Sequence, residues 1–403
     1  MLIPSERVFR EMYCDPAGIW YVPMKDAGVG LLLKAPTPTL KAVIFGCPID
    51  LLFGQCSSGS NSYLCTGARF HDTSDKPLIV VGLQRHADDH SALTDMLVGA
   101  GSPVSVFNEL DMCVASARGL IDRQDADRSL KLLDDAGQLF CDEFTQEARS
   151  CLDRFEVAVD RLCEGHADED FKIVSVPISF SDWEPTTNHF IGYLDNVKYE
   201  IHAPNEGAGL ETAIWYSLDS VFPGTLHKNP MVKRGNAWRE LIDVLSFYSL
   251  GVLLIESKAL TELGAGPRRS LERKMRSLKQ HIHKAIRQLV GATKAIRSDA
   301  AIRSMSGEEI TFNRDLVPHC IILAAELPHT DGWFDVVEAM MLAARETGAF
   351  FHLLDLRELL FLLKATKGQR ELIDYNLMQR FARFIETRSV HIRSALPLSH
   401  TSD

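Results

Sequence analysis

Two acidic residues and a lysine stand in a stretch of the chain that is otherwise mostly apolar. In RELIDVLSFYSLGVLLIESKAL (239–260), Asp243 lies in the first apolar segment, and Glu256 and Lys258 lie near the end of the second. An unpaired charge inside a strand that is buried on both faces is costly, or it shifts its pKa and neutralises. We therefore expect these three side chains to reach a solvated edge or to take part in chemistry.

Two carboxylates and a lysine are groups that serve the hydrolysis of a phosphodiester. The segments 239–247 and 251–260 predict two strands joined by a turn. If the strands are neighbours, Asp243 and Glu256 can point into one cleft, and period-two alternation places Lys258 on the face of Glu256. The carboxylates would hold Mg²⁺ or Mn²⁺, which neutralises the phosphate and activates a water that the lysine assists. The competing interpretation is a cross-strand ion pair between Asp243 and Lys258.

Helices and further strands are predicted on both sides of this pair of strands. Apolar residues at helical spacing predict a helix before it, and a strongly basic helix follows it with ten Lys or Arg and one acid, Glu272. The alternation of helices and strands that continues to the carboxyl end predicts an α/β sheet layered by helices. The expected elements are a helix at 210–222, the basic helix at 267–297, strands at 319–327 and 350–356 with a helix between them, and mainly helix over 357–389.

The pattern D-x(12)-E-x-K, with a Glu-bearing helix before it and a helix after it, resembles the PD-(D/E)xK nuclease superfamily. The resemblance implies a restriction-endonuclease-like fold for 205–403, in which a helix, three antiparallel strands, a second helix and a further strand form a mixed sheet flanked by helices. It implies that Asp243 and Glu256 bind the metal and that Lys258 assists the attacking water. Glu211 would match the glutamate that many members place on the first helix.

Two positions depart from the pattern of that superfamily. Ile242 stands where the superfamily has proline, a change without chemical cost because proline does not bind the metal. Glu240, three residues before Asp243, offers another carboxylate, so the register of the first acid is open.

The basic helix is the expected nucleic-acid contact, because Lys and Arg displace the counterions condensed on nucleic acid. A solvated basic face is the alternative interpretation. Gln288 shares a helix face with Lys284, four residues earlier. DNA is the expected substrate. The residues expected to contact it are Arg269, Arg273, Lys274, Arg276, Lys279, Lys284 and Gln288.

The amino-terminal half differs from the rest in charge. Residues 1–204 carry 17 Lys or Arg against 31 Asp or Glu, a net charge of -14, whereas 205–403 carries 26 against 23, a net of +3. We expect 1–168 to be a separate α/β and helical domain without an assigned role, and 169–204 to supply connecting strands. A hypothesis is that the acidic half shields the basic cleft or binds a protein partner.

Local patterns predict the elements of this half. Strands are expected at 41–46, 76–83 and 171–180, a helix ended by glycine at 87–101, and one long or two consecutive amphipathic helices over 126–166. The glycine-rich stretch 54–62 matches neither dinucleotide nor phosphate-loop patterns, so no nucleotide site is assigned to it.

Composition bounds the remaining possibilities. No apolar run approaches the length of a membrane helix, and we expect a cytoplasmic protein that does not contact membranes. Nine cysteines without a C-x-x-C pair are expected to be reduced, packed thiols. A homodimer is plausible, because cutting both strands of a duplex usually needs two sites. A catalytically inactive scaffold that kept the fold is the alternative function, and an enzyme in the amino-terminal half is a third possibility.

Overall fold

The chain divides into two compact units. The first comprises Met1–Asn188, Glu200–Pro204 and Gly266–Leu271, and the second His189–Tyr199, Asn205–Ala265 and Glu272–Asp403. The structure, a computed structural model, describes residues 4–24, 28–58, 61–73, 76–135, 139, 144–163, 165, 171–191, 196–201, 206–259, 271–298, 300–328 and 332–394. Within these ranges the side chains of 58, 189–191, 196–198, 206–211, 213, 258–259 and 271 lie outside the description.

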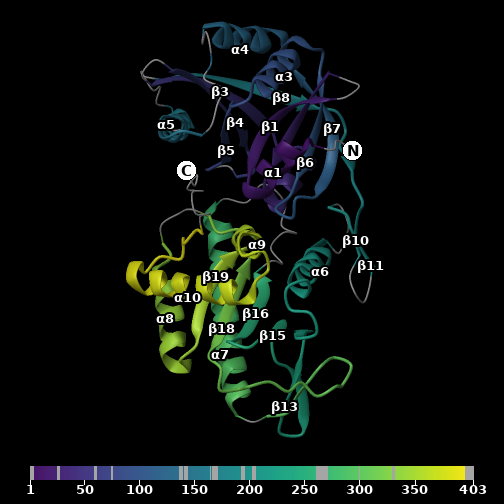
Figure 1. Cartoon of the computed structure of the whole chain (residues 1–403), viewed down its shortest axis with the longest axis vertical. Coiled ribbons are helices and arrows are strands. Elements are labelled where there is room, and N and C mark those ends of the chain that lie inside the picture. Colours follow the sequence, from purple (N-terminus) through teal and green to yellow (C-terminus); the bar gives the residue numbers. More distant parts are fainter. Residues whose placement is uncertain are drawn as a thin grey trace, which may run out of the picture. The chain divides into compact units, whose positions relative to one another are not determined.

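A nine-stranded sheet forms the first unit (Figure 1). The strand order is β1-β2-β6-β7-β8-β3-β4-β5, with β9 paired to β7, and most neighbours are antiparallel. The strands are β1 (Gly18–Met24), β2 (Gly28–Lys34), β3 (Ile49–Ser58), β4 (Asn61–Phe70), β5 (Leu78–Leu83), β6 (Ser102–Phe107), β7 (Cys113–Ile121), β8 (Lys172–Phe180) and β9 (Glu184–Pro185). The helices are α1 (Glu6–Cys14), α2 (Thr37–Ile44), α3 (Ala87–Val98), α4 (Arg123–Asp135) and α5 (Gln146–Cys163).

Several predicted elements of this unit are confirmed and one is wrong. The structure contains β5, β8, α3 with Gly99 after its end, and two successive helices over 126–166. The strand predicted at 41–46 is wrong, because this segment is the end of α2, which begins at Thr37 with Pro38 in its first turn. Proline suits that place since its missing N–H has no partner there in any helix. β8, from the stretch expected to connect the two halves, pairs with β3 and β7 in this sheet.

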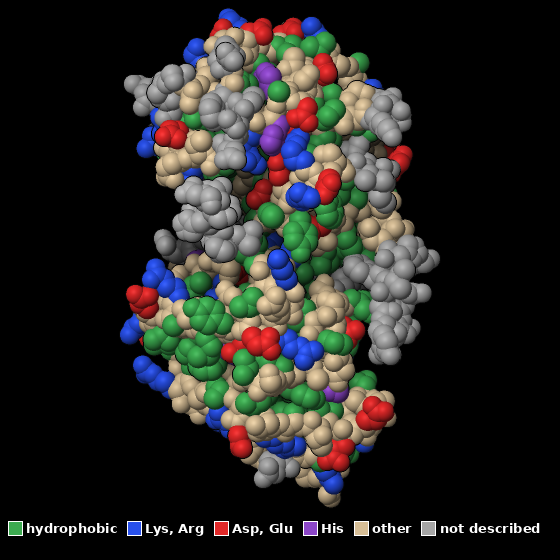
Figure 2. Space-filling model, viewed as in Figure 1, with side chains coloured by type: hydrophobic (Ala, Val, Ile, Leu, Met, Phe, Trp, Pro, Cys, Tyr) green, Lys and Arg blue, Asp and Glu red, His purple; other side chains and the backbone are tan. Residues whose placement is uncertain are grey.

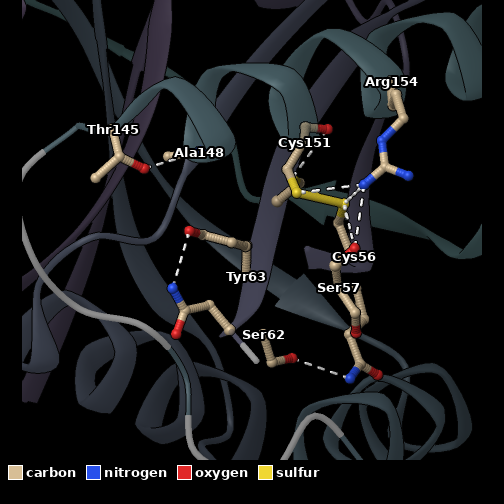
Figure 3. The surroundings of a disulfide bond; sticks show 11 residues. Cys56, Ser57, Ser62, Tyr63, Thr145, Ala148, Cys151 and Arg154 are labelled. Atoms are coloured by element: carbon tan, nitrogen blue, oxygen red, sulfur yellow. Dashed lines mark hydrogen bonds between the residues drawn. A yellow bond between two sulfur atoms is a disulfide. The ribbon is translucent and has the colours of Figure 1, made fainter. Parts of the chain in front are cut away.

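A disulfide joins Cys56 of β3 to Cys151 of α5 (Figure 3). The expectation that all nine cysteines are reduced is therefore wrong for this pair. The two residues are 95 positions apart in sequence, and their Cα atoms are 5.8 Å apart, a distance that a disulfide spans readily. Periodicity and spacing could not reveal this pairing, because only the packing of α5 on β3 brings the two side chains together.

The second unit has a five-stranded sheet of order β12-β15-β16-β18-β19. β12, β15 and β16 are antiparallel, and β18 and β19 continue the sheet in parallel with β16. β14, β13 and β17 form a small separate sheet, and β10 pairs with β11. The strands are β10 (Asn188–Ile191), β11 (Asn196–Tyr199), β12 (Leu226–Lys228), β13 (Met231–Arg234), β14 (Ala237–Glu240), β15 (Val244–Phe247), β16 (Val252–Ala259), β17 (Ile302–Arg303), β18 (Pro318–Ala324) and β19 (Phe350–Asp355).

Helices cover the five-stranded sheet (Figure 1). α7 and α8 pack on one face, where their apolar residues join those of β16, β18 and β19 in a single core cluster. The crossovers from β16 to β18 and from β18 to β19 each contain a helix, as parallel neighbours require. The helices are α6 (Glu206–Asp219), α7 (Leu271–Arg297), α8 (Phe334–Thr347), α9 (Leu356–Ala365) and α10 (Arg370–Thr387). The expected mixed α and β architecture, with mixed sheets flanked by helices, is confirmed.

The sequence predicts one strand over 239–247, and this prediction is wrong. The segment is a junction between two sheets. Glu240 ends β14 in the small sheet, and β15 begins at Val244 in the larger one. Regular alternation over three positions would place Glu240 and Asp243 on opposite faces, and the break at 241–243 lets both line one cavity. Leu241 and Ile242 turn into the core at this break, which explains why the whole segment looks apolar in sequence.

No helix in the described ranges is both long and apolar enough to cross a membrane. Apolar side chains do gather on the surface over α8 and α10 (Figure 2). Phe334 and Leu342 of α8 and Tyr375 of α10 are each at least 60% exposed. Exposed apolar patches often mark protein contacts, but the homodimer stays a prediction.

A buried ion cluster holds the last described segment onto α9 and α10. Glu358 Oε1 accepts hydrogen bonds from Arg380 Nη1 at 2.5 Å and from the Ser394 amide at 2.8 Å. Asp355 accepts from the Glu358 amide at 2.9 Å as the N-cap of α9, and it pairs with Arg393 at 2.6 Å. Burial alone would raise the pKa of Asp355, but Arg393 lowers it. Asp355 thus caps α9, and Glu358 anchors the last described segment through the Ser394 amide.

We predict that Arg380→Ala destabilises the second unit by about 3–5 kcal/mol, because it removes the cation hydrogen bonded to the buried Glu358 carboxylate and leaves Arg393, at 3.8 Å, as a more distant partner. Urea unfolding followed by circular dichroism measures the change. Arg383→Ala is the matched control on the same helix. Its partner Glu386 is exposed, and we expect a loss below about 1 kcal/mol. Equal losses for the two variants would contradict a stabilising role of the buried pair.

Candidate functional site

A cavity of about 260 Å³ opens between α6 and the face of the sheet opposite α7. Ile214, Trp215 and Leu218 of α6 form its apolar wall. The polar part of its lining comes from the strands and the segments next to them. It consists of Lys228, Asn229, Glu240, Asp243 and Ser257.

Asp243 is fixed at this cavity by the residue in the middle of the E-x-K pattern. Its Oδ2 accepts hydrogen bonds from the Ser257 amide at 2.8 Å and from the Ser257 hydroxyl at 2.9 Å. The Asp243 carbonyl accepts a further bond from the Asn229 amide at 2.8 Å. The predicted hairpin therefore does bring Asp243 to the end of β16.

Glu256 faces the other side of the sheet from Ser257. Ile255 and Ser257 line the cavity, whereas Leu254 belongs to the core under α7 and α8, so alternation places Glu256 on that core side. Its side chain is 0% exposed. The expectation that Asp243 and Glu256 share one cleft thus differs from the arrangement in the structure. The difference arises because Asp243 lies before β15 begins, in the bend that leads into the strand.

The other two predicted catalytic side chains lie outside the described residues. Lys258 belongs to β16 at an irregularity in its pairing with β18, between Glu256 and Ala259. Glu211 belongs to α6, four residues before the cavity residue Trp215. Their backbones therefore belong to elements that border the cavity, and their roles stay predictions.

The polar lining of the cavity fits the coordination chemistry of magnesium in kind. Glu240 and Asp243 contribute carboxylates, Ser257 a hydroxyl and Asn229 an amide, and Mg²⁺ prefers oxygen ligands. Within the described residues, no group of three or more His, Cys, Asp or Glu could hold a metal ion. Mg²⁺ needs only one or two carboxylates, because it keeps several waters and binds substrate phosphates.

Acidic residues of α8 pair with some of the basic residues of α7. Lys279 pairs with Asp335 at 2.7 Å, and His283 contacts the same carboxylate at 3.1 Å. Burial alone would raise the pKa of Asp335, but its hydrogen bonds from Lys279 and His283 lower it. Lys294 pairs with Glu346. These contacts stabilise the packing of α7 against α8, so not all of the helix charge is available to a ligand.

The remaining predicted contacts of α7 differ in exposure. Arg273, Arg276 and Lys284 are exposed, and Arg276 pairs with Glu272 of the preceding turn at 2.8 Å. Lys274 is half-buried, and Gln288 is half-buried with its Oε1 inaccessible to solvent. Arg269 lies outside the described residues. The structure therefore brings Arg273, Arg276 and Lys284 to one solvated stretch of the helix.

The small sheet carries a basic and aromatic surface that the sequence analysis did not single out. The Arg303 guanidinium lies 4.0 Å from the centre of the Trp238 ring, and Lys233 pairs with Trp238 across β13 and β14. Glu240, two residues after Trp238 on the same face of β14, lines the cavity. The clue in the sequence was the alternation in MVKRGNAWRE, which predicts a hairpin with exposed cations.

A second polar cluster lies inside this unit, on β18 and β19. His319 Nδ1 and His352 Nε2 are 3.0 Å apart, and Asp374 Oδ1 contacts His319 Nε2 at 3.3 Å and accepts from Tyr248 Oη at 2.5 Å. Burial lowers the pKa of both imidazoles. The two histidines are almost fully buried, so this network is suited to structural specificity rather than to substrate contact.

The amino-terminal His86 and His90 do not converge on a site. His86 contacts Glu11 at 3.2 Å, while the intervening Asp89 pairs with Arg7. The acids between the histidines are thus engaged in ion pairs that attach α1 to α3.

Comparison with known proteins returns no match to a family model, to a curated protein or to a solved structure. The function of the chain must therefore be argued from the cavity and the elements around it.

Proposed function

We propose that the second unit is a metal-dependent nuclease of the PD-(D/E)xK type that hydrolyses phosphodiester bonds in nucleic acid, with DNA as the expected substrate. The observation that carries the proposal is the pair of hydrogen bonds that tie Asp243 to Ser257 inside the E-x-K pattern, at the polar end of a cavity. Two motif elements that are distant in sequence meet there.

The order of elements supports the restriction-endonuclease-like fold. A helix (α6), three antiparallel strands (β12, β15 and β16), a second helix (α7) and a further strand (β18) follow one another in the chain, and the strands are neighbours in one sheet. This is the order that the resemblance implies. The small sheet of β13, β14 and β17 and the additional α8 and β19 extend that core.

Each residue at the cavity has a role in the proposal. Asp243, oriented by Ser257, is the principal metal ligand. Glu240 or Glu256 is the second carboxylate, and Lys258 assists the attacking water with Glu211 nearby on α6. When bound, Mg²⁺ or Mn²⁺ would neutralise the phosphate and lower the pKa of water. Lys228 is exposed at the cavity and is placed to contact a phosphate.

Binding would use the exposed cations Arg273, Lys284 and Lys233 and the half-buried Arg303. Arg273 and Lys284 lie on α7, which packs on the other face of the sheet from the cavity. Lys233 and Arg303 lie on the small sheet, on the face that continues to Glu240. A strand that contacts both sets would pass around the end of β16, where the E-x-K residues are.

One observation favours the alternative, a nuclease-like fold that binds nucleic acid without cutting it. Glu256 is fully buried on the core side of the sheet, away from Asp243. A metal site that needs both carboxylates would require a local change at the irregular end of β16. Cleavage assays on separate carboxylate variants distinguish the two functions.

We predict that Asp243→Asn lowers the rate of cleavage of supercoiled plasmid with Mg²⁺ or Mn²⁺ by about 100-fold or more. The substitution removes the charged carboxylate that would bind the metal ion. Glu240→Gln and Glu256→Gln, tested separately, show which acid is the second ligand. Glu338→Gln is the matched control, because Glu338 is an exposed acid on α8. We expect it to cut at the wild-type rate.

Melting temperatures with and without Mn²⁺ accompany these assays, so that loss of the fold is not mistaken for loss of chemistry. A ligand that binds the folded state raises the melting temperature, and we expect this rise to disappear in Asp243→Asn. Wild-type protein that binds DNA but cuts none with either metal would support the non-catalytic alternative.

We also predict that Arg273→Ala with Lys284→Ala weakens DNA binding and reduces the slope of log affinity against log salt by about 2, about one for each phosphate contact. The matched pair is Lys279→Ala with Lys294→Ala, on the same helix. Because these lysines are paired with Asp335 and Glu346, we expect the slope to fall by less than about 1. Fluorescence anisotropy in EDTA measures both, and equal slopes would contradict the assignment of α7.

A further inference from the structure

Three cysteines of the first unit lie in one apolar cluster. Cys56 of β3, Cys65 of β4 and Cys151 of α5 are almost fully buried beside Phe155 and Tyr63. The disulfide joins Cys56 to Cys151. Cys65 stays a thiol, and its sulfur lies 3.9 Å from the Cys151 carbonyl oxygen.

A guanidinium group contacts the disulfide directly (Figure 3). Arg154 Nη2 lies 2.6 Å from the Cys56 sulfur and 3.5 Å from the Cys151 sulfur, and it donates to the Ser57 carbonyl at 3.3 Å. Within the described part of the chain, Arg154 forms no ion pair with a carboxylate. Its positive charge is therefore directed at sulfur, one turn after Cys151 on the same helix.

A cation in this place favours thiolate chemistry. The thiolate is the form of cysteine that attacks and leaves in disulfide exchange, and a neighbouring Arg lowers the pKa of a thiol. Cys56 is closer to Arg154 than Cys151 is, so its thiolate is the more stabilised of the two. A neutral disulfide alone would gain little from the contact, whereas either thiolate would gain an ion pair.

The other titratable groups around the disulfide neither attack it nor neutralise Arg154. Burial raises the pKa of Cys65 to about 12 although Arg154 lowers it, so Cys65 stays protonated and does not attack the disulfide. Tyr63, opposite Cys56 on β4, is hydrogen bonded to Asn61. Asp153, next to Arg154 on α5, is an exposed acid. Arg154 is the cation that α5 presents to the sulfurs.

We propose that Cys56, Cys151 and Arg154 form a reversible thiol–disulfide exchange site whose substrate is a dithiol. A substrate thiolate, attracted by Arg154, attacks the Cys56 sulfur, the S–S bond breaks, and Cys151 leaves as a thiolate that takes up a proton. The second substrate thiolate attacks its own sulfur in the mixed disulfide and releases Cys56 as a thiolate beside Arg154. Two electrons pass to the cystine, and the dithiol leaves as a disulfide.

Access to the site is on the side of Arg154. Arg154 and Ser57 are exposed, while both sulfurs are buried. Approach therefore follows the guanidinium to the Cys56 sulfur. Reduction would remove the covalent link between β3 and α5 and leave the apolar cluster and the Arg154–Ser57 hydrogen bond between them.

The test measures the reactivity of Cys56 in the intact chain. After reduction, the rate of alkylation of each cysteine by iodoacetamide is followed by peptide mass spectrometry between pH 5 and 9. For Cys56, the midpoint is the pH at which the alkylation rate reaches half of its maximum. We expect this midpoint to rise by about one pH unit in Arg154→Gln, which makes alkylation at pH 7 about tenfold slower. Arg154→Lys should restore most of the wild-type midpoint. Arg149→Gln, an exposed arginine of the same helix, should leave it unchanged.

A second measurement follows opening of the oxidised protein without denaturant. We expect dithiothreitol to open the bond about tenfold more slowly in Arg154→Gln than in wild type, and glutathione to leave a mixed disulfide on Cys56. Circular dichroism confirms that each variant is folded. The proposal is overturned if the oxidised protein has no disulfide, if dithiothreitol does not open it in folded protein, or if Cys56 has the same midpoint with and without Arg154.

Discussion

The end of β16 depends on the two hydrogen bonds from Ser257 to Asp243. The Ser257 amide and hydroxyl both donate to one carboxylate oxygen, at 2.8 and 2.9 Å. This carboxylate stands where the chain leaves the small sheet and enters the large one. The interaction therefore fixes the junction between the two sheets, and with it the polar end of the cavity beside α6. A carboxylate is suited to this task because its hydrogen bonds are charge-assisted.

β16 itself joins two kinds of sheet. It is antiparallel to β15 and parallel to β18, so both of its edges are hydrogen bonded within the sheet. Its residues from Val252 to Ile255 are almost fully buried. In such a strand, successive side chains point to opposite faces, so a shift of one position moves a polar group from one face to the other. Ser257 faces the cavity while Glu256 faces the core, which gives the proposed active site a serine where the resemblance implies an acid. Glu240, from the neighbouring sheet, supplies the second carboxylate of the cavity.

Many of the charged side chains that the structure describes serve the packing of helices and strands. Lys279 and Lys294 of the basic helix are paired with acids of α8, and Arg380 with Arg393 neutralises the buried acids of α9. In the first unit, Arg154 is instead directed at two sulfurs. Net charge by segment therefore overstates what is available to a ligand, because a cation held by a partner releases fewer counterions from nucleic acid.

The sequence by itself determined the elements that have strong periodicity. The apolar spacing of α5 and α7, the glycine after α3 and the apolar runs of β16, β18 and β19 all identify these elements correctly. Local pattern was sufficient because each of these elements buries one continuous face or strand. It failed at 41–46, where apolar residues belong to the end of a helix that Thr37 and Pro38 begin.

Only the tertiary structure decided which side chains meet. The partners Asp243 and Ser257 are 14 residues apart, Cys56 and Cys151 are 95 apart, and Trp238 and Arg303 come from different strands of the small sheet. A break of three residues before β15 changed the face on which Asp243 lies, and no periodicity in the sequence marks it. Side-chain contacts depend on register, bends and helix packing, which are set by the whole core, and hence the candidate site could be located from sequence but not assembled from it.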